Sequence, residues 1–535
     1  MSCFILVLLF ALQKFGTQRV GFLFAPVLIA WLGFLSLIGA YNIWKWNPGV
    51  VRALSPYYGF KFLKVAGKED WTSLGCFVLC ITGSEAMFAD LGHFSKLSLR
   101  IAFSLIVFPS LLLAYMGEAA FISTHKEDLQ MTFFRSIPES IFWPVYVIAT
   151  LATIVGSQAS ISATFSLINQ CMSLNCFPPV KIIHTSNHVH GQIYIPEINW
   201  ILMLLCLSVT IGFRDTELIG NAFVLAVITV MFVTTCLMFL IIVTIWNRSI
   251  LLATLFTILF GSVELLYLLA CLANVSYGGW FPLVLSLFIL SIMAVWHYGT
   301  SRKLCYELEN SVQLDSILSC SSGLGIVRVP GIGLVFSSTP GGIPPMFSHF
   351  ITNFPAFHRI IIFVSIQILA VPKVPPEDRF LITAVGPRDS GFFGCIMRFG
   401  YKDDRDDACE FEDQLLKKVA DHLLRDASEI SAKASAIHGP SDVLVDDIST
   451  PSESNEEREV PVREEVRELL VQREAGVAYM TGHTCVKSHS SSSFLKVIAI
   501  DLIYGFLRRN CRQTSTLRLG LPQASLIQVG IVYHV

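Results

Sequence analysis

Residues 221–246 read NAFVLAVITVMFVTTCLMFLIIVTIW, a stretch of the chain without a charged side chain. About 20 apolar residues in a helix are enough to cross the hydrocarbon core of a bilayer. Trp246 stands at the end of the stretch, where an amphipathic ring suits the headgroup layer. The stretch therefore predicts a transmembrane helix.

The composition on either side extends this assignment to half of the chain. The 535 residues are 53% hydrophobic and 15% charged, whereas soluble proteins carry about 25% charged residues. Residues 1–300 hold 14 Lys/Arg and 12 Asp/Glu, and residues 301–535 hold 24 and 28. We therefore expect a polytopic α-helical membrane domain over 1–300, embedded in a lipid bilayer, and a cytosolic α/β domain over 301–535. The net charge of −2 gives no reason to expect a nucleic acid as partner.

The membrane half contains about nine segments that meet or approach the length of a membrane helix. They are Cys3–Leu12, Val20–Ile43, Trp71–Ala89, Ile101–Ile122, Trp143–Ile168, Trp200–Phe213, Asn221–Trp246, Leu251–Ala273 and Trp280–Trp296. We interpret the first as a transmembrane segment rather than a signal peptide, because no charged region precedes it. If the C-terminal tail is cytosolic, alternation of the helices places most Lys and Arg residues of the loops on the cytosolic side, in agreement with the positive-inside tendency. The cations of the 45–70 loop then lie outside, against that tendency, so the topology of this loop stays open.

The second half has the pattern of a globular domain. Strands are predicted at Ile326–Ser337, Arg359–Val371, Gly391–Tyr401, Gly476–Val486 and Ala524–Val535, and helices at Glu410–Ala427 and Phe494–Asn510. The polar, charged sequence near 428–475 predicts a disordered insertion. Gly331-Ile332-Gly333 is interpreted as a turn between strand pieces rather than as a phosphate cradle. Without a dinucleotide-binding or Walker motif, we expect no enzymatic activity and no bound cofactor.

The most informative polar stretch at membrane depth is ITGSEAMFADLGHF, residues 81–94. Thr82 and Ser84 flank a helix-weakening glycine, and Glu85 follows directly, so a discontinuous helix could present hard oxygen ligands there. Such ligands suit an alkali or alkaline-earth ion. The alternative is that both hydroxyls bond to their own helix while Glu85 stays protonated between helices.

Further ionisable and polar groups are weaker candidates. Asp90 and His93 share one helix face and form either a proton relay or gate, or a solvated helix end. Glu264 is either a proton carrier or a member of a buried structural pair. Ser157 and Gln158 belong to a small polar stripe, which either lines a pathway or allows close helix packing.

The stretch GSEAMFADLGHFS at 83–95 resembles the signature of the Kup/HAK/KT family of potassium transporters, in its plant branch. The similarity continues at GFLFAPV (21–27), GSQA (156–159), YIPEIN (194–199), GFRD (212–215), GGW (278–280), WHYGT (296–300), GIPP (342–345), FSHF (347–350) and LRRNC (507–511). It therefore covers nearly the whole chain.

The resemblance implies potassium uptake by proton symport, with K⁺ as transported ion and H⁺ as coupling ion. It implies a LeuT-like bundle of the amino acid-polyamine-cation superfamily, and K⁺ ligands at Thr82 and Glu85. We also expect a homodimer formed through the cytosolic domain, and residence in the plasma membrane or else the vacuolar membrane. The first three helices of the family pattern are not found in this sequence. The alternative function is therefore a truncated, non-transporting copy that regulates complete relatives or forms hetero-oligomers with them.

Overall fold

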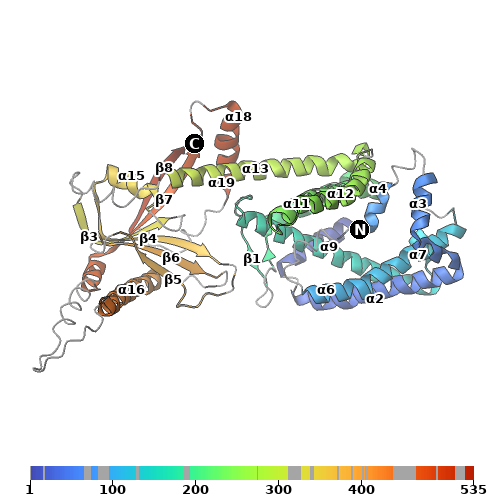
Figure 1. Ribbon diagram of the computed structural model, residues 1–535, viewed down its shortest axis with the longest axis horizontal. Helices are drawn as coiled ribbons and strands as arrows, with labels where there is room; N and C mark the ends of the chain where they lie inside the picture. Colours follow the sequence, from blue (N-terminus) through green and yellow to red (C-terminus); the bar gives the residue numbers. More distant parts are fainter. Residues whose placement is uncertain are drawn as a thin grey trace, which may run out of the picture. The chain divides into compact units, whose positions relative to one another are not determined.

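The computed structural model describes residues 2–15, 18–65, 74–81, 83, 95–127, 132–185, 193–273, 275–310, 327–337, 343–369, 371, 373–386, 390–400, 403, 408–437, 466–489, 492–511 and 525–535. Two compact units follow each other along the chain, Met1–Met293 and Ala294–Val535. Each unit has its own hydrophobic clusters, so each is described by itself (Figure 1).

The first unit is almost entirely helical. Its elements are α1 (Ser2–Leu12), η1 (Gln13–Phe15), α2 (Gln18–Lys45), η2 (Pro48–Leu54), α3 (Pro56–Val65), α4 (Leu74–Phe77), η4 (Val78–Ile81), α6 (Lys96–Ala102), η6 (Phe103–Val107), α7 (Phe108–Thr124), α8 (Thr132–Ser136), η7 (Glu139–Ile141), α9 (Phe142–Ser173), β1 (Ile183–His184), β2 (Ile193–Tyr194), α10 (Pro196–Phe213), α11 (Thr216–Thr244), α12 (Ile250–Ala273) and η8 (Val275–Gly279). Helix α13 (Trp280–Glu309) begins here and ends in the second unit.

Among the described residues, seven helical stretches are long and apolar enough to cross a membrane. They correspond to seven of the nine predicted segments. The predicted segment Cys3–Leu12 lies in α1, a helix of 11 residues, which is shorter than a bilayer-spanning helix. The predicted segment Trp71–Ala89 is described only in part. The protein is an integral, multi-pass membrane protein.

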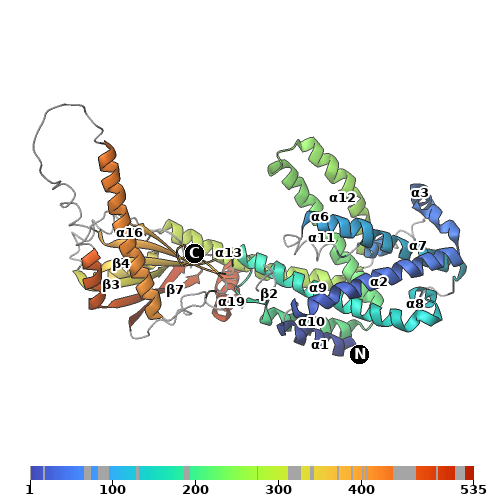
Figure 2. The same ribbon diagram turned by 90° about the horizontal axis from the view of Figure 1, so that it is seen from below.

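Helices α2 and α7 pack against each other through glycine. A Cβ atom on Gly117 would lie 2.5 Å from the Cα atom of Gly39, and one on Gly39 would lie 2.3 Å from the carbonyl oxygen of Leu113. The carboxyl ends of the two helices lie together. Trp46, which follows α2, contacts Phe121 in the last turn of α7, with ring centroids 5.9 Å apart. The two helices therefore run side by side in the same direction, as Figure 2 shows.

The second unit contains a six-stranded sheet. Its elements are β3 (Val327–Ser337), α15 (Pro345–Asn353), β4 (Ala356–Ile368), β5 (Phe380–Ala384), β6 (Phe392–Phe399), α16 (Ala408–Ile437), a helix over 466–475, β7 (Val477–Lys487), α18 (Phe494–Val497), η10 (Ile498–Tyr504), α19 (Gly505–Asn510) and β8 (Leu526–His534). The strand order is β5-β6-β4-β3-β7-β8, with β5 antiparallel to β6 and every other pair parallel. Helices α15 and α16 cover opposite faces (Figure 1).

Strand β3 lies near the middle of the sheet and contributes side chains to the hydrophobic cores on both of its faces. Ile332, Leu334 and Phe336 belong to the core under α16, whereas Val335 belongs to the core under α15. The register against β4 shifts between Val329 and Ile332, and Gly331 has a φ of +117°. The predicted turn at Gly331–Gly333 is therefore wrong: the chain forms one strand with an irregularity of the β-bulge kind.

Two further differences concern the predicted insertion and a missed strand. Residues 428–437 continue α16 and residues 466–475 form a helix, so helices occupy both ends of the region near 428–475, whose disorder stays a prediction. The sequence did not predict the short edge strand Phe380–Ala384. Its five residues are too few to show a clear alternation of apolar and polar side chains.

Candidate functional site

The described residues that lead to Gly83 form a short helical segment. Helix α4 has four residues and continues as the 3₁₀ segment η4, which ends at Ile81. Gly83 then has a φ of +111°, outside the α-helical region. The backbone at this glycine is therefore not helical, and the predicted discontinuous helix stays a prediction because residues 84–94 lie outside the described part of the chain. Thr82, Ser84, Glu85, Asp90 and His93 lie outside the described residues, so their roles as ligands, relay or gate stay predictions.

The segment that leads to Gly83 is held between other helices. Val78 is fully buried in a cluster with Val224, Leu225 and Ile228 of α11 and Cys271 of α12. Gly75 lies so close to α12 that a Cβ atom there would be 3.1 Å from the Cys271 sulfur. The chain before the signature is therefore packed tightly between α11 and α12.

Glu264 of α12 pairs with a hydroxyl of α11. The Thr235 hydroxyl donates a hydrogen bond of 2.9 Å to Oε1 of Glu264. The other carboxyl oxygen, Oε2, is enclosed and has no hydrogen-bond partner among the residues described. This geometry makes Glu264 part of a helix–helix contact and leaves its role in proton coupling a prediction.

The polar stripe of α9 makes two kinds of contact. Gln158 is 8% exposed and exchanges hydrogen bonds with Gln13, and the bond from Gln158 Nε2 to Gln13 Oε1 is 2.8 Å long. The Ser157 hydroxyl donates to the carbonyl oxygen of Thr153 in its own helix, at 3.0 Å. These contacts account for both side chains structurally, and their role in a pathway stays a prediction.

Sequence reasoning missed one buried amide at the same place. Asn199 of α10 is fully buried, and its Nδ2 donates a 3.1 Å hydrogen bond to the carbonyl oxygen of Phe10 in α1. Together with the glutamine pair, it attaches α1 to α9 and α10. The available signal was an amide within an apolar helix, which is costly in lipid unless it finds a partner.

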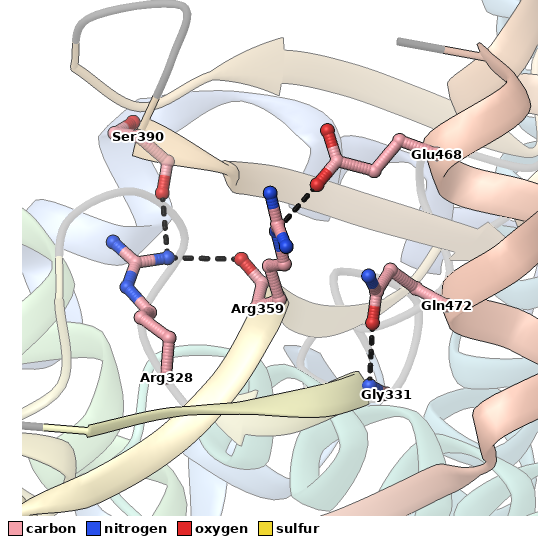
Figure 3. Close-up of polar contacts among 6 residues, drawn as sticks. All are labelled: Arg328, Gly331, Arg359, Ser390, Glu468 and Gln472. Carbon is pink, nitrogen blue, oxygen red and sulfur yellow. Dashed lines mark hydrogen bonds and ion pairs between the residues drawn. The ribbon is translucent and has the colours of Figure 1, made fainter. Parts of the chain in front are cut away.

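In the second unit, the clearest polar cluster joins the amino ends of three strands, as Figure 3 shows. Arg328 donates from one nitrogen to the carbonyl oxygens of Arg359 and Ser390, both at 2.9 Å. Arg359 forms an ion pair of 2.5 Å with Glu468, and Gln472 accepts a 2.7 Å hydrogen bond from the Gly331 amide.

These contacts hold the helix over 466–475 against the sheet, and both arginines are engaged in protein contacts. The cluster is therefore structural. Among the described residues, no group of three or more His, Cys, Asp or Glu side chains could hold a metal ion.

The family of the chain is shown by comparison with known proteins. Residues 1–301 match the model of the potassium transporter integral membrane domain, and residues 330–535 match that of the potassium transporter C-terminal domain. The first match covers the first structural unit, Met1–Met293, and the second lies within the second unit, Ala294–Val535.

Curated plant relatives are similar along the whole chain. Probable potassium transporter 13 of Oryza sativa subsp. japonica is 56% identical, and the alignment covers all of this chain and 74% of the relative. Potassium transporter 1 of Arabidopsis thaliana is 49% identical, with 72% of its length covered, and potassium transporter 4 of the same plant is 46% identical, with 75% covered. The chain therefore belongs to the family of potassium transporters.

Proposed function

We propose that this protein takes up K⁺ by proton symport, with Thr82, Ser84 and Glu85 at the ion site. The observation that supports the proposal is the φ of +111° at Gly83, a non-helical backbone conformation within the polar stretch 81–94. Backbone carbonyls freed by such an interruption are the ion ligands of transporters built on broken helices. A LeuT-like scaffold is part of the same proposal.

The chemistry of the residues supports a cation rather than an anion. Hydroxyl, carbonyl and carboxylate oxygens are hard ligands, which suit an alkali ion. A proton and a potassium ion both neutralise Glu85, so they compete for the same carboxylate. Because a symport carries both ions in the same direction, the proton then crosses on another carboxyl group, for which Glu264 of α12 is the candidate.

The test is uptake by the full-length protein in a yeast strain that lacks its own potassium uptake. We expect growth at low external potassium with the unmodified protein, and growth at least tenfold slower with Glu85→Gln, because the amide keeps the shape but not the charge. Glu139→Gln is the matched control, because Glu139 is exposed at the start of η7. Rubidium influx at two external pH values measures the coupling.

Equal growth of the strains carrying Glu85→Gln and the unmodified protein would remove Glu85 from the mechanism. Influx that is unaffected by external pH and by a protonophore would remove the proton from it.

The alternative is a copy that does not transport and instead pairs with complete relatives. Co-expression with a complete relative separates the two functions. Altered rubidium influx together with co-purification, without influx by this chain alone, would support the regulatory copy.

A homodimer through the C-terminal domain and residence in the plasma membrane complete the proposal. Strand β8 supports the dimer, because it is an edge strand with one row of backbone groups available for pairing. Light scattering of the purified full-length protein measures the number of copies, and a fluorescent fusion distinguishes the plasma membrane from the vacuolar membrane.

A further inference from the structure

The segment 46–65, which comprises η2 and α3, has an unusual surface for a loop between membrane helices. It contains three cations, Arg52, Lys61 and Lys64, and no Asp or Glu. Its apolar and aromatic side chains are exposed: Phe60 is 73% and Val65 75% exposed. A basic surface with exposed aromatic side chains is typical of a helix that lies in the membrane interface.

Contacts at the start of the segment place it at the membrane surface. Trp46 packs against Phe121 and His125 at the end of α7, with ring centroids 5.9 and 4.5 Å apart. The Asn47 side chain donates a 3.1 Å hydrogen bond to the Ser123 hydroxyl. It also accepts a hydrogen bond from the Gly49 amide and so caps the amino end of η2. The segment therefore begins where two membrane helices, α2 and α7, both end.

The helix itself separates charge from apolar surface. Lys61 and Lys64 are three residues apart and share one face of α3. Phe62 lies on the opposite side and packs edge-on against Phe77 of α4, with centroids 5.8 Å apart. The lysine face is therefore directed away from the protein contact, with the exposed Phe60 beside it.

We propose that η2 and α3 lie in the headgroup layer and bind anionic phospholipid. The aromatic side chains enter the boundary of the acyl chains, and Arg52, Lys61 and Lys64 contact headgroup phosphates. Two observations identify lipid as the occupant: the surface continues the lipid-exposed apolar surface at the end of α2, where Trp44 is 81% exposed, and its three cations, with no acidic residue beside them, are complementary to headgroup phosphates. This inference does not depend on transport.

The test is hydrogen exchange of the full-length protein in nanodiscs. One set contains phosphatidylcholine alone and the other phosphatidylcholine with phosphatidylserine. We expect the amides of 56–65 to exchange more slowly in the anionic discs, by roughly fivefold for each cation that contacts the surface.

Three double variants distinguish the contribution of the lysine charges from that of the apolar side chains that enter the bilayer. Lys61→Gln with Lys64→Gln abolishes the difference between the two lipids, whereas Lys417→Gln with Lys487→Gln, on the C-terminal domain, preserves it. Phe60→Gln with Val65→Gln speeds exchange in both lipids. Unchanged exchange of α7 peptides shows that each variant is folded.

Two results would overturn the proposal. The first is exchange of 56–65 that is identical in both lipids and in amphipol, which would mean that the protein alone holds the helix. The second is protection that rises with protein concentration but not with anionic lipid, which would assign the surface to a second copy of the chain.

Discussion

Gln158 illustrates how a single polar residue can be costly or stabilising in a membrane, depending on its partner. Its amide is satisfied by Gln13 in both directions, so neither side chain is left with an unpaired group on the facing side. Asn199 is satisfied on one side only: its Nδ2 donates to the Phe10 carbonyl, whereas its Oδ1 is buried without a hydrogen-bond partner among the described residues. At the residue scale, these amides attach the short helix α1 to the rest of its unit.

The first prediction concerns this pair. Gln158→Leu leaves the amide of Gln13 buried without its partner, so it should lower the free energy of unfolding by about 1–2 kcal/mol. Thermal unfolding in detergent, followed by circular dichroism, measures the effect. Ser157→Ala is the control, because Ser157 is half-buried and its hydroxyl donates to the carbonyl oxygen of Thr153 in its own helix. The double variant Gln13→Leu with Gln158→Leu should be less destabilised than the single one. Equal stability of Gln158→Leu and the unmodified protein contradicts the pairing.

Cys395 allows a second residue-scale prediction. It lies in β6 and is 1% exposed, and burial raises the pKa of its thiol to about 12. Only the thiolate reacts, and at pH 8 its fraction is on the order of 1 in 10⁴. Iodoacetamide at pH 8 should therefore modify the exposed Cys485 and leave Cys395 unmodified until the domain unfolds. Mass spectrometry of the peptides measures both. Equal rates in the native protein would show that the sheet opens at β6.

At the element scale, the crossing of α2 and α7 depends on the absence of side chains. A Cβ atom on Gly117 would lie 2.5 Å from the Cα atom of Gly39, closer than two carbon atoms can approach, and the contacting atoms belong to the backbone. A backbone cannot move aside as a flexible side chain can. Close approach of this kind is how helices gain packing energy in lipid.

Gly117→Ala should therefore separate the two helices and destabilise the membrane unit by at least about 1–3 kcal/mol. Gly33→Ala in α2 is the control, because a Cβ atom there meets nothing within 4 Å. It should be neutral or stabilising by up to about 1 kcal/mol, because alanine favours helix. The midpoint of thermal unfolding in detergent compares the two. If both alanines have the same effect, the crossing is looser than described.

The sequence predicted the elements better than it predicted their contacts. Seven membrane helices and five strands of the second unit follow from apolar runs of characteristic length, such as residues 221–246. The non-helical backbone at Gly83 agrees with the expectation that a glycine between two hydroxyl residues weakens a helix. The pairing of Gln158 with Gln13 could not be predicted, because the two residues are 145 positions apart and nothing local links them.

At the scale of the whole molecule, α13 belongs to both units. Its 30 residues give a length of about 45 Å, more than the hydrocarbon core requires. From Ala294 onward it is part of the C-terminal unit. There Trp296 packs on Tyr504 with centroids 5.3 Å apart, and Tyr306 stacks on Tyr533 at 4.4 Å. The α/β domain therefore includes the end of the last membrane helix in its core.

This arrangement predicts the effect of one methyl group on the C-terminal unit. A Cβ atom on Gly299 would lie 2.4 Å from the ring of Tyr504, so Gly299→Ala should displace that ring. Hydrogen exchange of peptides from 494–511 should become at least tenfold faster. Gly505→Ala is the control, because its Cβ atom meets nothing closer than 3.6 Å. Unchanged exchange in Gly299→Ala would show that η10 and α19 do not depend on α13.

Strand β3 has a consequence for how the gene can vary. Ile332, Leu334 and Phe336 face one core and Val335 the other, and a Cβ atom on Gly333 would press on the His358 ring at 3.2 Å. No codon from 332 to 336 encodes a solvent-facing position. A saturation library across β3 should therefore show five consecutive sites that do not tolerate polar substitutions. A strand with one solvent-exposed face would instead show alternating tolerant and intolerant sites.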